Sequence, residues 1–201
     1  MPQQIIFVRH GETTHNKEKK LMNWIHDVGT LSELGKHEAS LVGNKLQQYH
    51  IDAMYASDLR RTKETADIIA KHLGITPIFT KYLRERDLGD FGDLTMDEIG
   101  SKWPDKLAKF LDHSDIDWHD HGGESLRDVH NRFIEFLSTL ETKHSKENIL
   151  FVTHSGFLYT TIRDVFGLLP KNSWLDVAHT SVTILEKSGD QYLLKSFNKI
   201  D

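Results

Sequence analysis

The chain has 201 residues, of which 38% are hydrophobic and 27% charged, and its formal net charge is −5. This composition is typical of a soluble globular protein, and the negative charge argues weakly against nucleic acid as the main partner. The absence of cysteine excludes disulfides, thiolate metal sites and cysteine nucleophiles. No apolar run reaches the roughly 18 residues that span a membrane, and no signal-peptide core follows Met1. We therefore expect a cytoplasmic protein without a membrane partner.

The first half of the chain alternates short apolar runs with amphipathic stretches. The predicted elements are, in chain order, a buried strand at 5–8, a helix after the N-cap Ser32, a strand at 53–56, a helix at 59–73 that ends at Gly74, and a strand at 78–79. We expect the helix after Ser32 to pack through one apolar face made of Leu34, Leu41, Val42 and Leu46.

The second half begins with an irregular stretch at 84–123 that is rich in Gly, Asp, His and Trp. The elements predicted in this half are a short helix at 106–111, an amphipathic helix at 124–140, a buried strand at 149–152, a helix at 156–166 and two strands at 181–185 and 191–197 joined by a hairpin. The stripe of the 124–140 helix comprises Leu126, Val129, Phe133, Phe136, Leu137 and Leu140. Alternating strands and helices predict one α/β domain over 1–201, with a cap-like insertion at about 84–123.

Polar residues follow two of the predicted strands, where α/β sheets bind ligands. Arg9, His10 and Gly11 follow the first strand, and His154 with Ser155 follows the fourth. An arginine offers forked donors to phosphate oxygens, a glycine lets the backbone approach a ligand, and the helix start beyond it would present free N–H groups to an anion. These groups suit a phosphoryl group placed against an imidazole nitrogen.

Two further motifs have a functional and a plain structural interpretation. Ser57-Asp58-Leu59-Arg60-Arg61-Thr62 can direct one arginine into the cleft, or it can be a capped helix with exposed basic residues. Leu83-Arg84-Glu85-Arg86-Asp87-Leu88-Gly89 places a carboxylate among basic neighbours, which can also be a surface ion-pair cluster.

Five motifs in this order resemble the histidine phosphatase superfamily, which contains the cofactor-dependent phosphoglycerate mutases and their phosphatase relatives. They are Arg9-His10-Gly11-Glu12-Thr13 with Asn16, Ser57-Asp58-Leu59 with Arg61-Thr62, Leu83 with Glu85 and Gly89, Gly123-Glu124-Ser125, and Val152-Thr153-His154. The resemblance extends from Ile5 to Thr183. It implies a three-layer α/β/α sandwich with a six-stranded, mostly parallel sheet that has one antiparallel strand.

The resemblance also implies roles for individual residues. His10 is the nucleophile that becomes phosphohistidine, and Glu85, which must begin protonated, gives and takes the proton. The residues expected to hold the phosphoryl group or substrate are Arg9, Arg61, His154, Asn16, Ser155 and the backbone N–H groups from Gly11 onward. Arginines near a buried imidazole disfavour its charged form and stabilise a transferring phosphoryl group, so we expect neither a metal nor another cofactor.

Some positions depart from the common family pattern and affect the expected pocket shape. Gly92 and Asp93 replace a glutamate and a glycine, Asn23 precedes Trp24 where glycine is frequent, and Ser155 replaces a glycine. The short tail and the lack of tandem arginines in 96–122 favour net hydrolysis of a small phosphorylated metabolite over mutase activity.

Two other interpretations of the sequence compete with a metal-independent phosphatase. The histidines and aspartates from His113 to His121 could mark a metal-dependent phosphohydrolase, although an exposed, specificity-tuning loop fits their spacing better. A non-catalytic protein that binds phosphorylated ligands is the other alternative. Most of the 13 histidines are expected at the surface, His26, His50, His72 and His144 among them.

Overall fold

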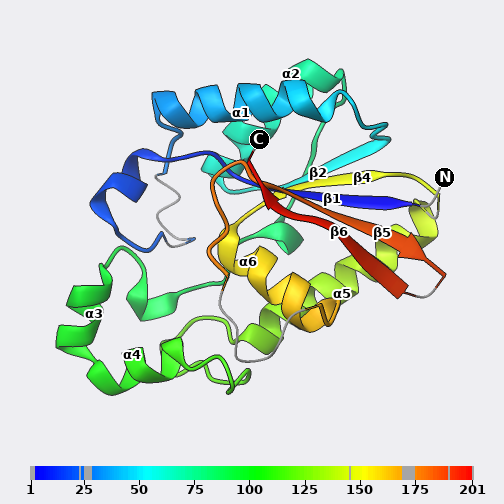
Figure 1. The fold of residues 1–201 in the computed structure, drawn as a ribbon. Helices are drawn as coiled ribbons and strands as arrows, with labels where there is room; N and C mark the ends of the chain where they lie inside the picture. The colour runs from blue at the N-terminus through cyan, green and yellow to red at the C-terminus, as the bar shows by residue number, and fades with distance from the viewer. Residues whose placement is uncertain are drawn as a thin grey trace.

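A six-stranded sheet forms the centre of the computed structural model, which describes residues 3–22, 24, 29–144, 146–168, 175–189 and 191–200. The strand order is β3-β2-β4-β1-β5-β6 (Figure 1). The strands are β1 (Gln4–Arg9), β2 (Ala53–Ser57), β3 (Ile78–Thr80), β4 (Ile149–Thr153), β5 (Val182–Ser188) and β6 (Gln191–Lys199). β3, β2, β4 and β1 pair in parallel, whereas β5 runs antiparallel to both β1 and β6. The predicted sheet with one reversed strand is therefore confirmed.

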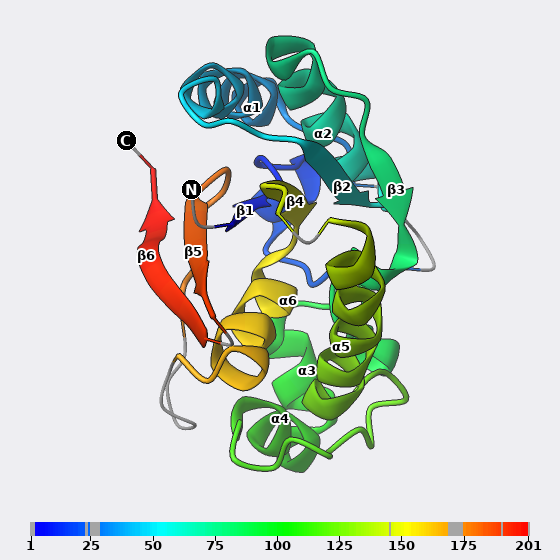
Figure 2. The same ribbon diagram turned by 90° about the vertical axis from the view of Figure 1, so that its right-hand side faces the viewer.

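Helices cover both faces of this sheet and give the predicted three layers. Figure 2 shows α1 (Glu33–Leu46) and α2 (Arg60–Leu73) on one face, and α5 (Leu126–Lys143) and α6 (Ser155–Thr160) on the other. Because side chains alternate along a strand, β1 contributes to two cores. Ile6 and Val8 pack with the α1–α2 side, and Ile5 and Phe7 pack with the α5–α6 side.

The buried face of α1 differs from the predicted one. Ser32 caps the helix as expected, but Leu34 and Leu41 are 53% and 48% exposed. The residues that α1 buries are Gly35, Ala39, Val42, Gly43 and Leu46. A Cβ on Gly35 would lie 2.0 Å from the carbonyl oxygen of Glu12, so small residues bring this helix close to its neighbours. The leucine spacing therefore predicted the helix correctly and its packing face incorrectly.

The stripe predicted for α5 is confirmed, because its six residues are all buried. Beyond its end lies His144, which was expected at the surface and is only 7% exposed. Its ring nitrogens contact the Tyr55 hydroxyl at 2.7 Å and the Glu147 carboxylate at 2.5 Å. Polar partners thus let this histidine lie inside the protein.

Shorter helical elements complete the chain. The helix predicted at 156–166 ends as α6 at Thr160 and continues as a π-helical turn at Thr161–Val165. The 3₁₀ turns are Thr14–Glu18, Lys81–Leu83 and Gly89–Phe91.

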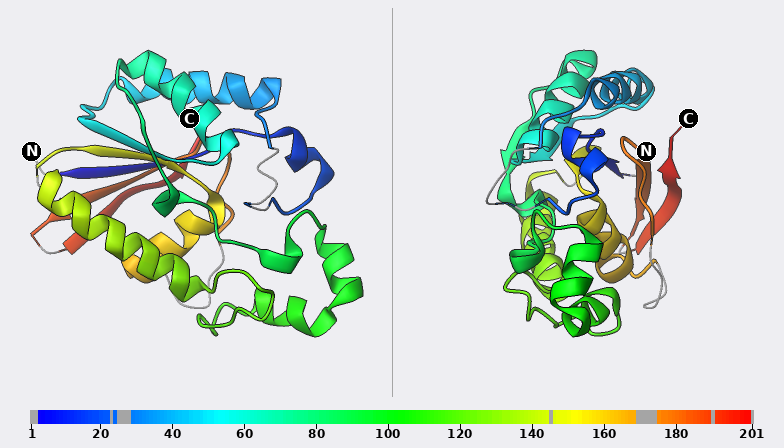
Figure 3. Two further views of the ribbon diagram at one scale, coloured as in Figure 1. Left: turned by 180° about the vertical axis from the view of Figure 1, so that it is seen from behind. Right: turned by 90° about the vertical axis from the view of Figure 1, so that its left-hand side faces the viewer.

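The segment 84–123 lies beyond the carboxyl ends of the parallel strands (Figure 1, Figure 3). It contains the predicted short helix as α4 (Pro104–Leu111) and a second helix, α3 (Met96–Lys102), which was not predicted. Leu88, Phe91, Ile99 and Trp118 form a small core of their own. We name this segment the cap. That the whole chain is one domain with an inserted cap stays a prediction.

Candidate active site

A pocket of about 210 Å³ opens at the carboxyl ends of β1 and β4, between the sheet and the cap. Six of the residues selected from the sequence line it, namely Arg9, His10, Asn16, Arg61, Glu85 and Ser155. His154 and Gly11 do not line the pocket. His154 lies beneath it, with its ring centroid 5.2 Å from that of His10.

His10 follows the last residue of β1 and is only 2% exposed. Its Nδ1 lies 2.8 Å from the carbonyl oxygen of Gly11. Because a carbonyl only accepts hydrogen bonds, Nδ1 carries the proton and Nε2 keeps its lone pair. Burial, followed by the charges of Arg61 and Arg9, holds the pKa of His10 well below its usual value. The ring is therefore neutral and can act as a nucleophile through Nε2.

Two arginines bring positive charge to this imidazole. Arg9 ends β1 and donates from Nη1 to the carbonyl oxygen of Val177 at 2.5 Å. Arg61 is 1% exposed, in the first turn of α2. The neighbouring Arg60 points away and pairs with Glu64 at 3.2 Å. The structure thus places Arg61, not Arg60, in the pocket.

His154 is held from below by two hydroxyl groups. Its Nε2 lies 2.9 Å from Ser57 Oγ and 3.1 Å from Thr62 Oγ1. Its Nδ1 is buried and has no hydrogen-bond partner among the described residues. Burial, with Arg61 as the next cause, holds the pKa of His154 well below its usual value. Ser57 and Thr62, which lie at the two ends of the motif that contains Arg61, therefore position the ring of His154.

The carboxylate of Glu85 is fixed by three backbone N–H groups. Arg86 N and Phe157 N donate to Oε1 at 2.9 and 2.7 Å, and Gly156 N donates to Oε2 at 3.0 Å. A Cβ on Gly156 would lie 2.7 Å from Oε1, so a glycine is needed for the carboxylate to reach the start of α6. A proton on this group must use a lone pair that the three amides leave open.

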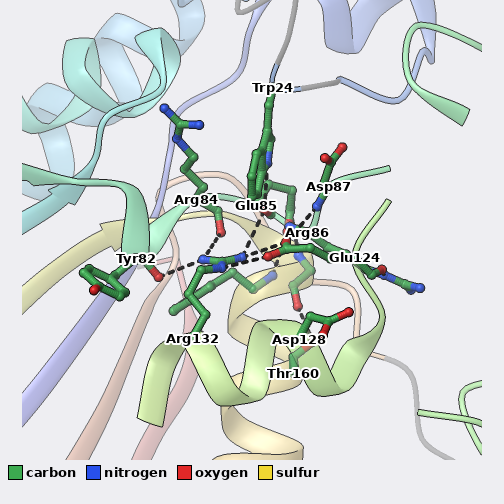
Figure 4. A network of polar contacts seen from close by, with 12 residues as sticks. Trp24, Tyr82, Arg84, Glu85, Arg86, Asp87, Glu124, Asp128, Arg132 and Thr160 are labelled. Atoms are coloured by element: carbon green, nitrogen blue, oxygen red, sulfur yellow. Dashed lines mark hydrogen bonds and ion pairs between the residues drawn. The ribbon is translucent and has the colours of Figure 1, made fainter. Parts of the chain in front are cut away.

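The backbone around Glu85 is clamped by Arg132 of α5 (Figure 4). Arg132 donates to both carboxylate oxygens of Glu124 at 2.9 Å, and to the carbonyl oxygens of Tyr82 at 2.8 Å and Arg84 at 3.1 Å. Its Nη2 also lies 3.3 Å from the carbonyl oxygen of Glu85. Sequence reasoning missed Arg132. It belongs to none of the five motifs, and its role depends on carbonyl groups that only the fold brings to it.

Gly11 and Asn16 were both expected to bind the phosphoryl group, but only Asn16 lines the pocket. The N–H of Gly11 donates to Thr65 Oγ1 at 3.1 Å, and a Cβ here would lie 2.5 Å from the carbonyl oxygen of Gly35. The lack of a side chain at Gly11 therefore permits the close packing against α1, and its predicted part in phosphate binding stays a prediction. Asn16 lines the pocket, and its Oδ1 accepts from Thr13, which leaves its NH₂ group as the donor. The helix start expected here is a 3₁₀ turn.

The far wall of the pocket comes from residues to which the sequence analysis gave no role in the site. It is mostly apolar, with Leu21, Met22, Leu88, Met96, Phe110 and Tyr159. Arg86 adds a cation that is only 7% exposed, and burial lowers its pKa to about 10. Its acceptors are carbonyl oxygens, those of Glu124 at 2.6 Å and Trp118 at 3.4 Å. Of the two arginines in the 83–89 motif, Arg84 fits the predicted ion-pair cluster, because it contacts Asp58 at 2.6 Å. Arg86 does not fit it.

The histidines of the cap do not converge. His113 lines the pocket, whereas His121 is fully buried and stacks on Trp118 at 4.9 Å between ring centroids. In the part of the chain that the structure describes, no group of three or more His, Cys, Asp or Glu residues could hold a metal ion. The expected substitution at Asn23 lies outside the described residues.

Comparison with known proteins identifies the family of this chain. The family model "Histidine phosphatase superfamily (branch 1)" matches residues 5–200. The chain is 34% identical to phosphoglycerate mutase-like protein 4 of Arabidopsis thaliana, over 92% of this chain and 88% of the relative. It is 32% identical to a metal-independent phosphoserine phosphatase of the same organism, over 93% and 87%. A mycobacterial glucosyl-3-phosphoglycerate phosphatase structure superposes with a TM-score of 0.88 at 25% identity and covers 98% of this chain and 99% of its own. The chain is thus a member of the histidine phosphatase superfamily, branch 1.

Proposed function

We propose that this protein is a metal-independent phosphomonoesterase that hydrolyses small phosphorylated metabolites through a phosphohistidine on His10. The observation that carries the proposal is the pocket itself. A neutral imidazole with a free Nε2 lies beside Arg9 and Arg61, and the carboxyl group of Glu85 lines the same pocket. The cations stabilise the equatorial phosphoryl oxygens, which is the main requirement for phosphoryl transfer.

In the first step, His10 Nε2 attacks phosphorus in line with the ester oxygen. The Nε2–P bond forms, the P–O ester bond breaks, and a proton on Glu85 moves to the leaving oxygen, which departs as an alcohol. The Nδ1 proton stays on the ring and remains bonded to the carbonyl oxygen of Gly11, so the phosphorylated ring is positively charged.

In the second step, water attacks the phosphohistidine. An O–P bond forms, the P–Nε2 bond breaks, and the electron pair returns to Nε2. Glu85 takes one proton of the water, and inorganic phosphate leaves. The positive charge on the ring makes His10 a good leaving group, and the cycle returns both residues to their starting states.

The far wall of the pocket supports a small substrate with both apolar and acidic parts. Arg86 and Lys20 can bind an acidic group, while the apolar residues beside them bind carbon atoms. The relatives named above include phosphatases of phosphoserine and of glucosyl-3-phosphoglycerate, two phosphorylated acids. The cytoplasmic location and the absence of a nucleic-acid partner stay part of this proposal. Among the described residues, no helix has the length and apolar character to cross a membrane.

A trapping experiment tests the proposal. The wild type is mixed with a radiolabelled phosphomonoester, quenched in alkali and digested, and the label should be found on His10. His10→Ala should remain folded and lose nearly all turnover, and EDTA should leave wild-type activity intact. Label on another residue, or loss of activity in EDTA, would contradict the proposal.

Phosphoglycerate mutase activity is the second candidate, because a relative with 34% identity is named as mutase-like. Both activities share the phosphohistidine and differ in whether water or a second phosphoglycerate accepts the group. We propose net hydrolysis. Isomerisation of 3-phosphoglycerate much faster than its hydrolysis would assign the mutase instead.

A further inference from the structure

A third imidazole, His179, lies beside His10 and has no part in the reaction described above. Its ring centroid is 5.9 Å from that of His10, with an angle of 47° between the ring planes. His179 belongs to neither strand of the hairpin. It lies in the turn that leads into β5, far from His10 in the sequence.

The turn that carries His179 is fastened to the active site from two sides. Arg9 donates to the carbonyl oxygen of Val177, and Thr180 N donates to the carbonyl oxygen of Arg9 at 3.1 Å. From β6, the Asn198 side chain accepts from Ala178 N at 2.8 Å.

The backbone of this turn is also strained. Thr180 has a φ of 50°, in the left-handed region that β-branched residues rarely adopt. Such a conformation persists only where the surrounding structure enforces it, and these positions cluster at functional sites. The position of His179 is therefore fixed and not that of a freely moving loop residue.

The Nε2 atom of His179 is buried and, in the described part of the chain, has no hydrogen-bond partner. Arg9 Nε and His154 Nδ1 share this condition, and both belong to the group around His10. Burial, followed by the charge of Arg9, lowers the pKa of His179 to about 4. The ring is thus neutral near pH 7 and has one N–H to donate.

We infer that His179 is a further phosphoryl-binding residue, whose Nε2–H donates a hydrogen bond to an oxygen of the phosphoryl group during its transfer to and from His10. A neutral donor can bind the anion without adding a third positive charge, which Arg9 and Arg61 would repel. The inference rests on the proposed phosphatase function and adds a residue to its phosphate site.

Inorganic phosphate, the reaction product, is the probe that tests this inference. Its Kd is measured by calorimetry for the wild type, His179→Ala, His179→Asn and the control His72→Ala. His72 bonds Ser40 on the outer helices and is remote from His10. We expect His179→Ala to weaken phosphate binding by at least about tenfold, equivalent to about 1.4 kcal/mol. His179→Asn, which keeps an N–H donor, should restore most of the affinity, and His72→Ala should match the wild type.

An unchanged Kd in His179→Ala would overturn the inference, and so would an equal loss in the alanine and asparagine variants, because a donor role predicts rescue. If His179→Ala does not fold, the imidazole ¹⁵N resonances of the wild type decide. The Nε2 resonance of His179 should shift when phosphate is added, and an unmoved resonance at saturating phosphate would reject the contact. Failure of the wild type to form phospho-His10 would instead overturn the proposed function, so the two failures are separable.

Discussion

The two ring nitrogens of His10 have separate roles because the backbone binds one of them. Gly11 accepts from Nδ1, which leaves Nε2 for chemistry. This assignment could not come from the sequence, since Arg-His-Gly says nothing about which nitrogen meets the carbonyl group. The sequence did predict that Arg9, His10 and His154 lie close together, because residues at the ends of parallel strands must meet at one edge of the sheet. The role of His10 as nucleophile came from the family resemblance and stays a prediction.

A methyl group added at Gly156 should displace the Glu85 carboxylate and so test its role as the acid. Gly156→Ala places a Cβ within 2.7 Å of the Glu85 carboxylate and should displace it. We expect kcat/KM, which reports the first step, to fall by at least about tenfold for an alkyl phosphate and much less for p-nitrophenyl phosphate, whose leaving group needs no proton. Gly100→Ala in α3, which meets only the Leu107 side chain, is the control and should keep both rates. An equal decrease for both substrates would contradict the role of Glu85 as the acid.

Arg86 should determine which substrates bind well. Arg86→Met removes the cation at the far wall and keeps apolar bulk. We expect KM to rise by about tenfold or more for phosphoserine, which has a carboxylate, and to change little for p-nitrophenyl phosphate, which has none. Equal KM changes for the two esters would show that Arg86 acts only through the cap structure.

Among the elements, α5 and α1 show what a hydrophobic pattern can predict. On α5 the stripe of large apolar residues is the buried face, so the pattern gave both the helix and its orientation. On α1 the closest contacts are made by Gly35 with Glu12 and by Gly43 with His72, and they are possible because glycine has no side chain. The helix α3 begins with a capping box at Thr95 and Glu98, a local signal that was present in the sequence and not used.

The clamp from α5 should matter for both stability and turnover. Arg132→Met removes the donors that Arg132 supplies to Glu124 and to three carbonyl oxygens, and the ion pair is 13% and 18% exposed. Glu124 keeps a hydrogen bond from Asp87 N, and the Glu85 carbonyl oxygen keeps one from Trp24 Nε1. We expect the free energy of unfolding to fall by about 2 kcal/mol and kcat to fall as the Glu85 backbone loosens. Chemical denaturation and kinetics measure the two effects.

A matched arginine provides the control for that experiment. Arg127 lies on the same helix and pairs with Asp117, but the two side chains are 49% and 62% exposed. Arg127→Met should therefore cost less than about 1 kcal/mol and leave kcat unchanged. If the two variants behave alike, the clamp has no special effect on the site.

For the whole molecule, buried neutral histidines link folding to pH. The pKa values of His10 and His154 lie well below the usual value, and those of His121 and His179 are lowered to about 4. Below about pH 6.5 these histidines are protonated in the unfolded chain but stay neutral in the folded protein. Stability should therefore be complete above this pH and fall as the pH decreases towards 4. Unfolding in urea at a series of pH values measures this loss.

His121, in the cap, should account for part of the dependence of the free energy of unfolding on pH. His121→Phe keeps an aromatic ring against Trp118 and removes the titrating group, so it should reduce the slope between pH 6.5 and 4 by at most about 1.4 kcal/mol per pH unit. His50→Ala, whose side chain is 83% exposed, should leave the slope as it is. A slope that His121→Phe does not change would place the acid sensitivity elsewhere.

The alternation along β1 has a consequence for length variation in relatives of this protein. Ile5 and Phe7 face one core and Ile6 and Val8 the other, and His10 follows in the same register. Inserting or deleting one residue within β1 would exchange the two sets and turn the nucleophile to the wrong side. Indels should therefore be excluded from this strand and accumulate in the cap, where a family can acquire new substrates while its phosphoryl chemistry stays the same.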